Sequence, residues 1–275
     1  ILNPLRSTMF ITGASVGFGK RLKWPDDYFS LYTEASYQYY ELKNYPYFVL
    51  ANGYANDFNC KVHITRNSLD QTIFPKSGSN FSLLGQFTPP YSLFNGTNYE
   101  TASAETRYKF IEYQKYKITA EWFTQLTNKK AGEGKEARNL VLRTKIGYGI
   151  LGMYNKKVGV SPFERYYMGG SGLSGYQNFV AREIIGLRGY TDNSLSSSSG
   201  DPICARYTME LRYPISLNPQ ATIFVLGFAE AGNTWAKYKD FNPFQVKRSA
   251  GFGLRVFLPM FGLLGLDYGW GFDNI

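Results

Sequence analysis

The sequence lacks long apolar runs and has very little cysteine or histidine. No stretch of about 18 consecutive apolar residues occurs, which excludes a transmembrane helix, although 44% of the 275 residues are hydrophobic. The chain has one histidine and two cysteines, Cys60 and Cys204, which lie far apart in the sequence. Such a pair supports neither a disulfide framework nor a metal site. We expect the protein to need no metal and no other cofactor.

Aromatic residues and glycines are abundant instead. The chain contains 23 Tyr, 21 Phe and 28 Gly, and aromatics make up 17% of it. This composition fits either a soluble all-β protein or a transmembrane β-barrel, and the preference of aromatic rings for membrane interfaces favours the barrel. The net charge of +9 comes from Lys and Arg residues scattered along the chain. Scattered cations suit a polar lumen better than a nucleic-acid surface, so we expect no nucleic-acid partner.

Ten segments alternate between apolar and polar residues with the period of a β-strand. In the clearest, apolar residues from Leu140 to Ile150 share one face, while Arg143, Lys145 and two glycines share the other. An apolar face beside a charged face suits lipid outside and water inside, so we predict an all-β, antiparallel transmembrane β-barrel. The ten predicted strands are Phe10–Phe18, Phe29–Tyr39, Phe58–Ile64, Phe81–Phe87, Tyr116–Trp122, Leu140–Ile150, Tyr207–Tyr213, Ile223–Ala231, Phe252–Val256 and Leu264–Phe272.

The orientation of the strand Ile223–Ala231 stays open. Phe224, Leu226 and Phe228 make both of its faces apolar. A slip of one residue would turn every side chain to the other side of the sheet. The pattern therefore does not say which of its residues face the lumen.

The connections between the ten segments alternate between short and long. Short turns on one rim and long loops on the other are typical of bacterial outer-membrane barrels, with the short turns in the periplasm. A soluble sandwich has no reason to keep that order over ten strands. The short set is Trp24–Asp27, Phe74–Gly78, Asn128–Glu136, Asn218–Pro219 and Pro259–Gly262, and the long set is Lys43–Asn56, Thr88–Ser103, Met153–Pro202 and Lys237–Gln245.

The longest connection carries the most specific motif. A glycine-rich block, Met168-Gly169-Gly170-Ser171-Gly172, is followed by Leu187-Arg188-Gly189-Tyr190. With Glu164–Met168 before it and Tyr207–Pro214, Ala229–Trp235, Ser249–Arg255 and Gly265–Gly269 after it, this pattern resembles the BamA family of outer-membrane protein assembly factors. The resemblance covers nearly the whole chain, and that family carries an Arg-Gly-aromatic motif in this loop. Trp24–Phe29 and the insertion before Leu187 are most similar to the Bacteroidota branch.

The resemblance implies a barrel of sixteen strands, of which this chain supplies the sixth to the fifteenth. It also implies periplasmic POTRA repeats before residue 1 and an aromatic-ended terminal strand after residue 275, both outside the chain. Ile1 begins inside a segment that reads as structure, without a signal peptide, which agrees with a mature fragment. We therefore expect residues 1–275 to form a barrel fragment with a long extracellular or luminal loop, 153–203.

The resemblance also implies a role for Arg188. In the family the loop folds into the lumen, where this arginine pairs with acids on two strands, at the positions of Glu210 and Glu230. A guanidinium in a narrow lumen loses hydration and needs carboxylate partners, and bidentate pairing would fix the depth and orientation of the loop. The alternative is an arginine on a solvated extracellular loop, with Glu210 merely lining a wet lumen.

The neighbours of Arg188 are also expected to help hold the loop in the lumen. Leu187 and Tyr190 flank the Arg-Gly pair. Gly189 would allow the loop tip to approach the lumen wall closely, and Gly169 and Gly170 would form the compact turn on which the tip rests. The alternative for the glycines is a flexible extracellular loop.

No catalytic site is predicted. His63 shares a face with Lys61 and Thr65, which points it into the lumen, and no serine lies two residues beyond it. A lipid-facing pair of His and Ser, as in outer-membrane phospholipases, is therefore not expected. Arg188 between Glu210 and Glu230 would hold both carboxylates ionised, which suits structure better than proton transfer.

The resemblance implies the central barrel of an assembly machinery in the bacterial outer membrane. Such a barrel would fold and insert β-barrel clients by strand pairing at a weak seam. Its partners would be nascent outer-membrane β-barrel proteins, periplasmic and surface lipoproteins of an assembly complex, and outer-membrane lipid. Two alternatives remain: a two-partner-secretion transporter of the same superfamily, and a passive porin, which would not need the arginine loop.

Overall fold

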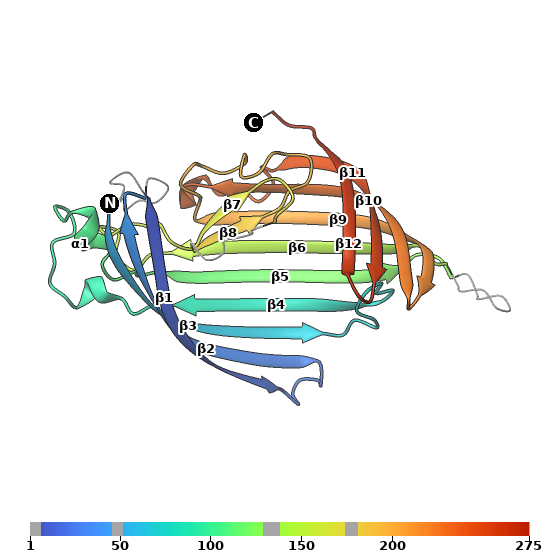
Figure 1. The fold of residues 1–275 in the computed structure, drawn as a ribbon, viewed down its shortest axis with the longest axis horizontal. Coiled ribbons are helices and arrows are strands. Elements are labelled where there is room, and N and C mark those ends of the chain that lie inside the picture. Colours follow the sequence, from blue (N-terminus) through green and yellow to red (C-terminus); the bar gives the residue numbers. More distant parts are fainter. Residues whose placement is uncertain (1–6, 46–51, 129–137, 174–180, 275) are drawn as a thin grey trace, which may run out of the picture.

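A computed structural model shows the protein as one curled antiparallel sheet with a long loop on its concave side (Figure 1). The structure describes residues 7–45, 52–128, 138–173 and 181–274. Ten strands follow one another around the sheet with one interruption, where the loop 153–202 joins β6 to β9. They are β1 Thr8–Arg21, β2 Phe29–Lys43, β3 Gly53–Asn67, β4 Gly78–Phe87, β5 Gln114–Gln125, β6 Val141–Gly152, β9 Ile203–Asn218, β10 Ala221–Trp235, β11 Lys247–Leu258 and β12 Gly262–Gly271.

The remaining elements are short and belong to connections. Two strands inside the long loop, β7 Arg165–Met168 and β8 Arg182–Ile185, pair in parallel. The helical turns are η1 Tyr91–Leu93, α1 Ala104–Tyr108 and η3 Tyr238–Asp240. Among the described residues, none of these helices has the length and apolar character that a membrane span requires.

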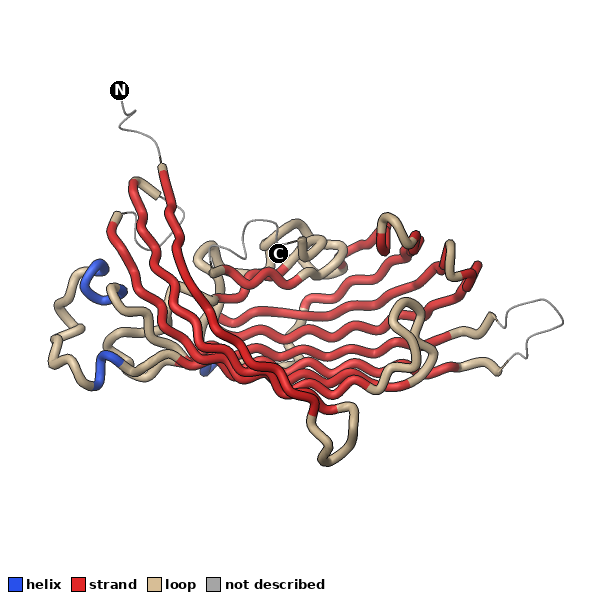
Figure 2. The backbone as a smooth tube through the Cα atoms, turned by 60° about the horizontal axis from the view of Figure 1, so that its bottom comes forward, coloured by secondary structure: helices blue, strands red, loops and turns tan. Residues whose placement is uncertain are grey.

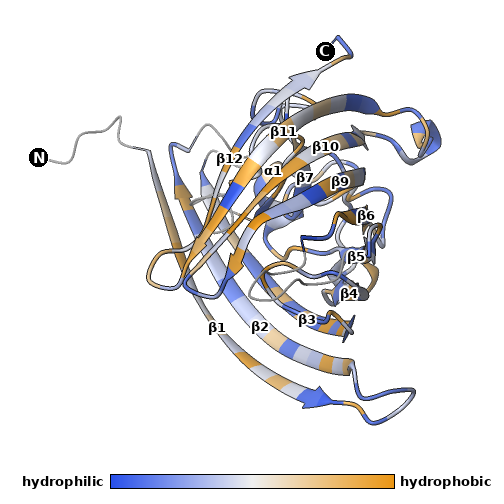
Figure 3. Ribbon diagram, turned by 90° about the vertical axis from the view of Figure 1, so that its right-hand side faces the viewer, coloured by the Kyte–Doolittle hydropathy of each residue, from blue (hydrophilic) through white to orange (hydrophobic). Residues whose placement is uncertain are grey.

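All ten predicted strands are confirmed, and the antiparallel all-β prediction with them. The central strands β9 and β10 alternate in exposure, whereas β1 and β12, at the two edges of the sheet, are exposed on both faces over most of their length. In β9, Met209 and Leu211 are 53% and 43% exposed on the convex face, whereas Glu210 between them is 2% exposed on the concave face. We call the concave face the luminal face (Figure 3). Apolar residues on the convex face suit contact with lipid.

The orientation of β10 is settled by its neighbours. Phe224, Leu226 and Phe228 are all buried and lie on the luminal face, on the same side as Glu230. A shift of register between Ile223 and Phe224 marks a bulge near the start of this strand. Luminal phenylalanines are possible here because they pack in a cluster with Phe74, Phe123 and Val141. The lumen wall therefore carries an apolar patch on β10, beside the charged residue Glu230.

The connections keep the predicted alternation only in part. Two residues join β9 to β10 and three join β11 to β12, but the predicted short connection between β3 and β4 has ten residues, 68–77, against eleven, 236–246, between β10 and β11. The long ones join β4 to β5, β6 to β9 and β10 to β11, at the end of the sheet where α1 lies (Figure 1). The connection from β4 to β5 continues through α1 to Glu112 and Tyr113, beyond the predicted end at Ser103. Residues 46–51 and 129–137, parts of two predicted connections, lie outside the described residues. The long loop 153–202 thus starts on the long-loop rim.

That loop folds back against the luminal face rather than away from the sheet (Figure 2). Its side chains form the largest buried apolar cluster, in which Phe163, Tyr166, Met168 and Leu187 pack against Tyr40 and other wall residues. All four are fully buried. Burial of this apolar surface stabilises the loop against the wall.

Candidate functional site

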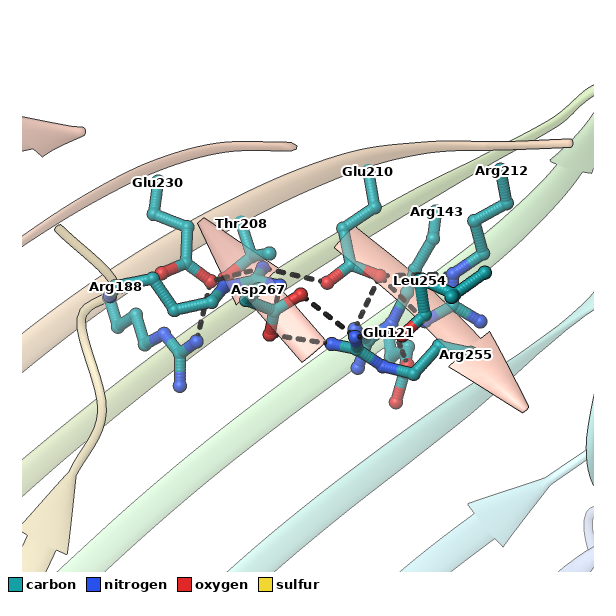
Figure 4. A network of polar contacts seen from close by, with 11 residues as sticks. Glu121, Arg143, Arg188, Thr208, Glu210, Arg212, Glu230, Leu254, Arg255 and Asp267 are labelled. Atoms are coloured by element: carbon teal, nitrogen blue, oxygen red, sulfur yellow. Dashed lines mark hydrogen bonds and ion pairs between the residues drawn. The ribbon is translucent and has the colours of Figure 1, made fainter. Parts of the chain in front are cut away.

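Arg188 lies at the tip of the loop, between two carboxylates on adjacent strands (Figure 4). Its Nη2 is 2.8 Å from Glu210 Oε1 on β9 and 2.7 Å from Glu230 Oε1 on β10. A third carboxylate, Asp267 on β12, lies 3.4 Å from Nη1. The side chains of Glu210 and Glu230 are 3% and 0% exposed. The structure thus brings together the three residues that the sequence analysis paired.

Two further contacts hold the arginine. The backbone N–H of Arg188 donates to Glu230 Oε2 at 2.9 Å, so this carboxylate binds both the main chain and the side chain. The guanidinium carbon lies 3.7 Å from the ring centroid of Phe228 on the luminal face. A desolvated cation–π contact of this kind contributes on the order of 2 kcal/mol. Position and orientation of Arg188 are therefore both fixed.

The carboxylates are shared with other cations of the wall. Glu210 also binds Arg143 Nη1 at 2.9 Å and Arg212 Nη2 at 2.6 Å. Glu230 also binds Arg206 Nη2 at 2.6 Å, and Asp267 binds Arg255 Nη2 at 2.8 Å. A buried ion network of this kind requires each carboxylate to stay ionised, because losing one partner leaves an uncompensated charge. We call Arg143, Arg188, Arg206, Arg212, Glu210, Glu230 and Asp267 the luminal network.

The charge on Arg188 is maintained in this network. Burial alone would lower the pKa of its guanidinium, but the hydrogen bond and the charge of Glu230, with the charge of Glu210, raise that pKa above its ordinary value. The loop tip therefore carries a permanent positive charge. Carboxylates clamped by permanent cations are suited to holding a loop, and less suited to exchanging protons with a substrate.

Gly189 and Tyr190 join the loop tip to β12. Gly189 has φ +93°, and a Cβ there would lie 2.5 Å from the carbonyl carbon of Trp270 and 2.7 Å from the nitrogen of Gly271. Only glycine allows the main chain to approach β12 so closely. The Tyr190 hydroxyl donates to the Arg248 carbonyl at 2.7 Å and accepts from the Asp273 amide at 3.2 Å. The Arg-Gly-Tyr sequence thus makes three different attachments.

The glycine-rich block forms the turn behind the tip. Gly169 and Gly170 have φ +130° and +70°, and a Cβ on Gly170 would lie 1.6 Å from Asp192 Oδ1. Gly170 pairs with Leu187 in an antiparallel bridge, and the Leu187 side chain is fully buried. The two segments of the motif, far apart in the sequence, therefore lie side by side, with Leu187 as the apolar anchor before Arg188.

A second attachment of the loop did not follow from the sequence. Lys115 on β5 is only 2% exposed, and its Nζ lies 2.7 Å from Glu164 Oε2 and 2.5 Å from Glu183 Oε2, both in the loop. Lys117, two residues on along β5, pairs with Glu183 as well. The only sequence signal was the luminal orientation of these lysines. Phe228 on β10 and Asp267 on β12 also contact Arg188 and were not predicted as its partners.

We expect this second attachment to weaken in acid. Burial opposes the charged form of Glu183, but Lys115 and Lys117 outweigh it and lower the pKa of this carboxyl from 4.5 to about 2. The pKa of Glu183 is depressed in the docked state, so ionised Glu183 contributes up to about 3 kcal/mol to the stability of the docked loop. This contribution is complete above about pH 4.5 and is lost as the pH falls through about 2. Hydrogen exchange of the loop amides, corrected for the intrinsic exchange rates, measures this loss of stability.

The Gly169 amide, which donates to the Ile185 carbonyl at 3.0 Å, is a suitable probe of this docking. It should lose protection between pH 5 and about pH 2.5. The variant Glu183→Gln is the control, and its loop should be less protected already at neutral pH. Unchanged protection of the wild type at both pH values would show that Glu183 does not hold the loop.

His63 points into the lumen, as its place in the strand predicts. Its Nε2 lies 2.7 Å from the hydroxyl of Ser82 on β4, a serine distant in sequence that was not predicted as its partner. The pair lies on the luminal wall and not on the lipid-facing side. It therefore differs in position from the lipid-facing pair of the outer-membrane phospholipases.

Comparisons with known proteins agree with this architecture. Residues 8–275 match the Omp85 superfamily domain. A solved structure, BamA from Haemophilus ducreyi lacking POTRA domains 1–3, is similar with a TM-score of 0.68 at 19% sequence identity. The match covers 100% of this chain and 53% of the other, so the chain spans about half the length of that protein. No curated protein matches the chain. The chain belongs to the Omp85 superfamily.

Proposed function

We propose that this chain is part of the central barrel of an outer-membrane protein assembly machinery. In this proposal it lies in the bacterial outer membrane and helps to fold and insert β-barrel clients, as the name of its superfamily relative BamA and the resemblance of the loop motif suggest. Clients would pair with a weak seam of the complete barrel through main-chain hydrogen bonds. The partners would be nascent barrel proteins, lipoproteins of the assembly complex and the surrounding lipid.

The observation that carries the proposal is the loop anchored in the lumen. Arg188 attaches it to β9 and β10, and Lys115 attaches it to β5, on the other side of β6. A lumen occupied by an anchored loop is a poor passage for a solute, which argues against a passive porin. Two-partner-secretion pores share the loop motif, so the liposome test below, and not the anchored loop, separates insertion into the membrane from secretion through the barrel.

The proposal is tested with the full-length protein in liposomes. An unfolded outer-membrane barrel protein is added outside, and its folding is followed by the altered gel mobility of folded barrels. We expect faster folding than in empty liposomes, no passage of the client into the liposome interior, and low single-channel conductance. Protease protection of an unfolded client inside the liposomes would instead identify a secretion pore, and high conductance with the loop intact would identify a porin.

A further inference from the structure

A cavity separates the loop from part of the lumen wall. It has a volume of about 280 Å³ and lies between the luminal faces of β5, β6 and β9 and the loop segments around Ser171 and Gly186. The wall contributes Lys117, Thr119, Lys145 and Arg206. The volume is just below the range of small-molecule sites, and it equals that of several water molecules.

The cations of this cavity are not all neutralised. Among the residues that the structure describes, Lys145 has no hydrogen bond or ion pair. Arg206 uses Nη2 to bind Glu230, but its Nε is buried and has no hydrogen-bond partner. Glu183 also lines the cavity, and its charge is matched by Lys115 and Lys117. The remaining excess charge on the cavity wall is positive.

An unpaired cation and an unsatisfied buried N–H are both costly, and one ligand would relieve both. We propose that the cavity binds a small phosphate-type oxyanion. Lys145 and the Arg206 Nε would supply charged donors, and the hydroxyls of Thr119 and Ser171 neutral ones. Phosphate fits this set because it offers several acceptor oxygens and more than one negative charge.

The position of the cavity indicates a consequence for the loop. Its wall comes from three barrel strands, whereas Ser171, Gly172 and Gly186 come from the loop. An anion bound there contacts both, so it binds the docked arrangement in preference to an undocked one. By linkage, the anion stabilises the docked loop. This inference does not depend on the proposed assembly function, and the two can fail separately.

The test is calorimetric titration of inorganic phosphate into the folded full-length protein in detergent micelles at low salt. We expect saturable binding to the wild type and at least tenfold weaker binding to Lys145→Met, since a charge-assisted hydrogen bond is lost. Lys61→Met is the matched control. Lys61 also points into the lumen but pairs with Glu34 at 3.1 Å and lies outside the cavity, so its variant should bind like the wild type.

A second variant blocks the cavity without changing its charge. Gly147 on β6 lines the cavity, and a Cβ there has no neighbour closer than 4.0 Å. Valine suits a strand, so Gly147→Val should fold, as gel mobility would show, and should bind phosphate at least tenfold more weakly. Equal binding by the wild type, Lys145→Met and Gly147→Val would overturn the proposal, as would no binding by the wild type.

Lipid headgroups also carry phosphate groups. An additional experiment distinguishes free phosphate from a lipid phosphate. A short-chain phosphatidic acid in the micelles should not compete with inorganic phosphate, because the cavity lies between the luminal faces of β5, β6 and β9 and the loop. Competition in the wild type, with no phosphate bound by Gly147→Val, would assign the site to a lipid phosphate. Competition that persists in that variant would show that the phosphate binds elsewhere, against the proposal.

Discussion

Arg188→Glu is expected to release the loop from the lumen wall and to abolish growth support in cells that depend on this protein. Removing one partner of a buried ion pair costs about 3–5 kcal/mol, because the other charge is left uncompensated. The new carboxylate would also face Glu210 and Glu230, which are almost fully buried and within 3 Å of the present guanidinium. Protease sensitivity of the loop in the folded barrel measures the release directly.

The control for this variant is Arg138→Glu, which makes the same charge change at an exposed position. It should leave the loop protected and growth unchanged. Arg188→Lys should be intermediate, since an ammonium could replace Nη2 between Glu210 and Glu230 but not the Nη1 contact to Asp267 or the planar stacking on the Phe228 ring. If Arg188→Glu kept wild-type protection, the network would not be what holds the loop.

The second large effect is expected for Gly189→Val. The clashing neighbours are main-chain atoms of Trp270 and Gly271, which cannot rotate away as a side chain could. The backbone conformation at φ +93° adds about 1–3 kcal/mol of strain for a residue with a side chain. The tip should therefore move off β12 and carry Arg188 out of reach of Asp267. Loss of hydrogen-exchange protection at residues 187–190 would report this movement.

Gly262→Val separates strain from clash. Gly262 has a similar backbone conformation, with φ +79°, but a Cβ there has no neighbour within 4 Å. This variant should be strained without losing any contact of the loop. Equal loss of loop protection in Gly189→Val and Gly262→Val would mean that backbone strain, and not the close approach to β12, decides the docking.

The two attachments of the loop differ in how far the sequence predicts them. Arg188, Glu210 and Glu230 belong to a motif that is recognisable from its neighbours in the chain, so their pairing could be proposed before the structure. Lys115 and Glu183 carry no motif, and Glu164, although it begins the motif segment Glu164–Met168, had no predicted partner. Their contact depends on how the loop folds back, and β5 and β8 are separated by more than fifty residues of chain.

Alternation of side chains by itself determined the ten antiparallel strands and most of their orientations, because a strand between lipid and water must place apolar and polar residues on opposite faces. Alternation could not orient β10, because Phe224, Leu226 and Phe228 lie on the luminal face, which is polar in the other strands. The tertiary structure decided this, since the luminal face of β10 packs against Phe74 and Phe123 and receives the Arg188 guanidinium over Phe228. A sequence pattern tells apolar from polar, whereas only the folded chain tells which apolar residues meet lipid and which meet the loop.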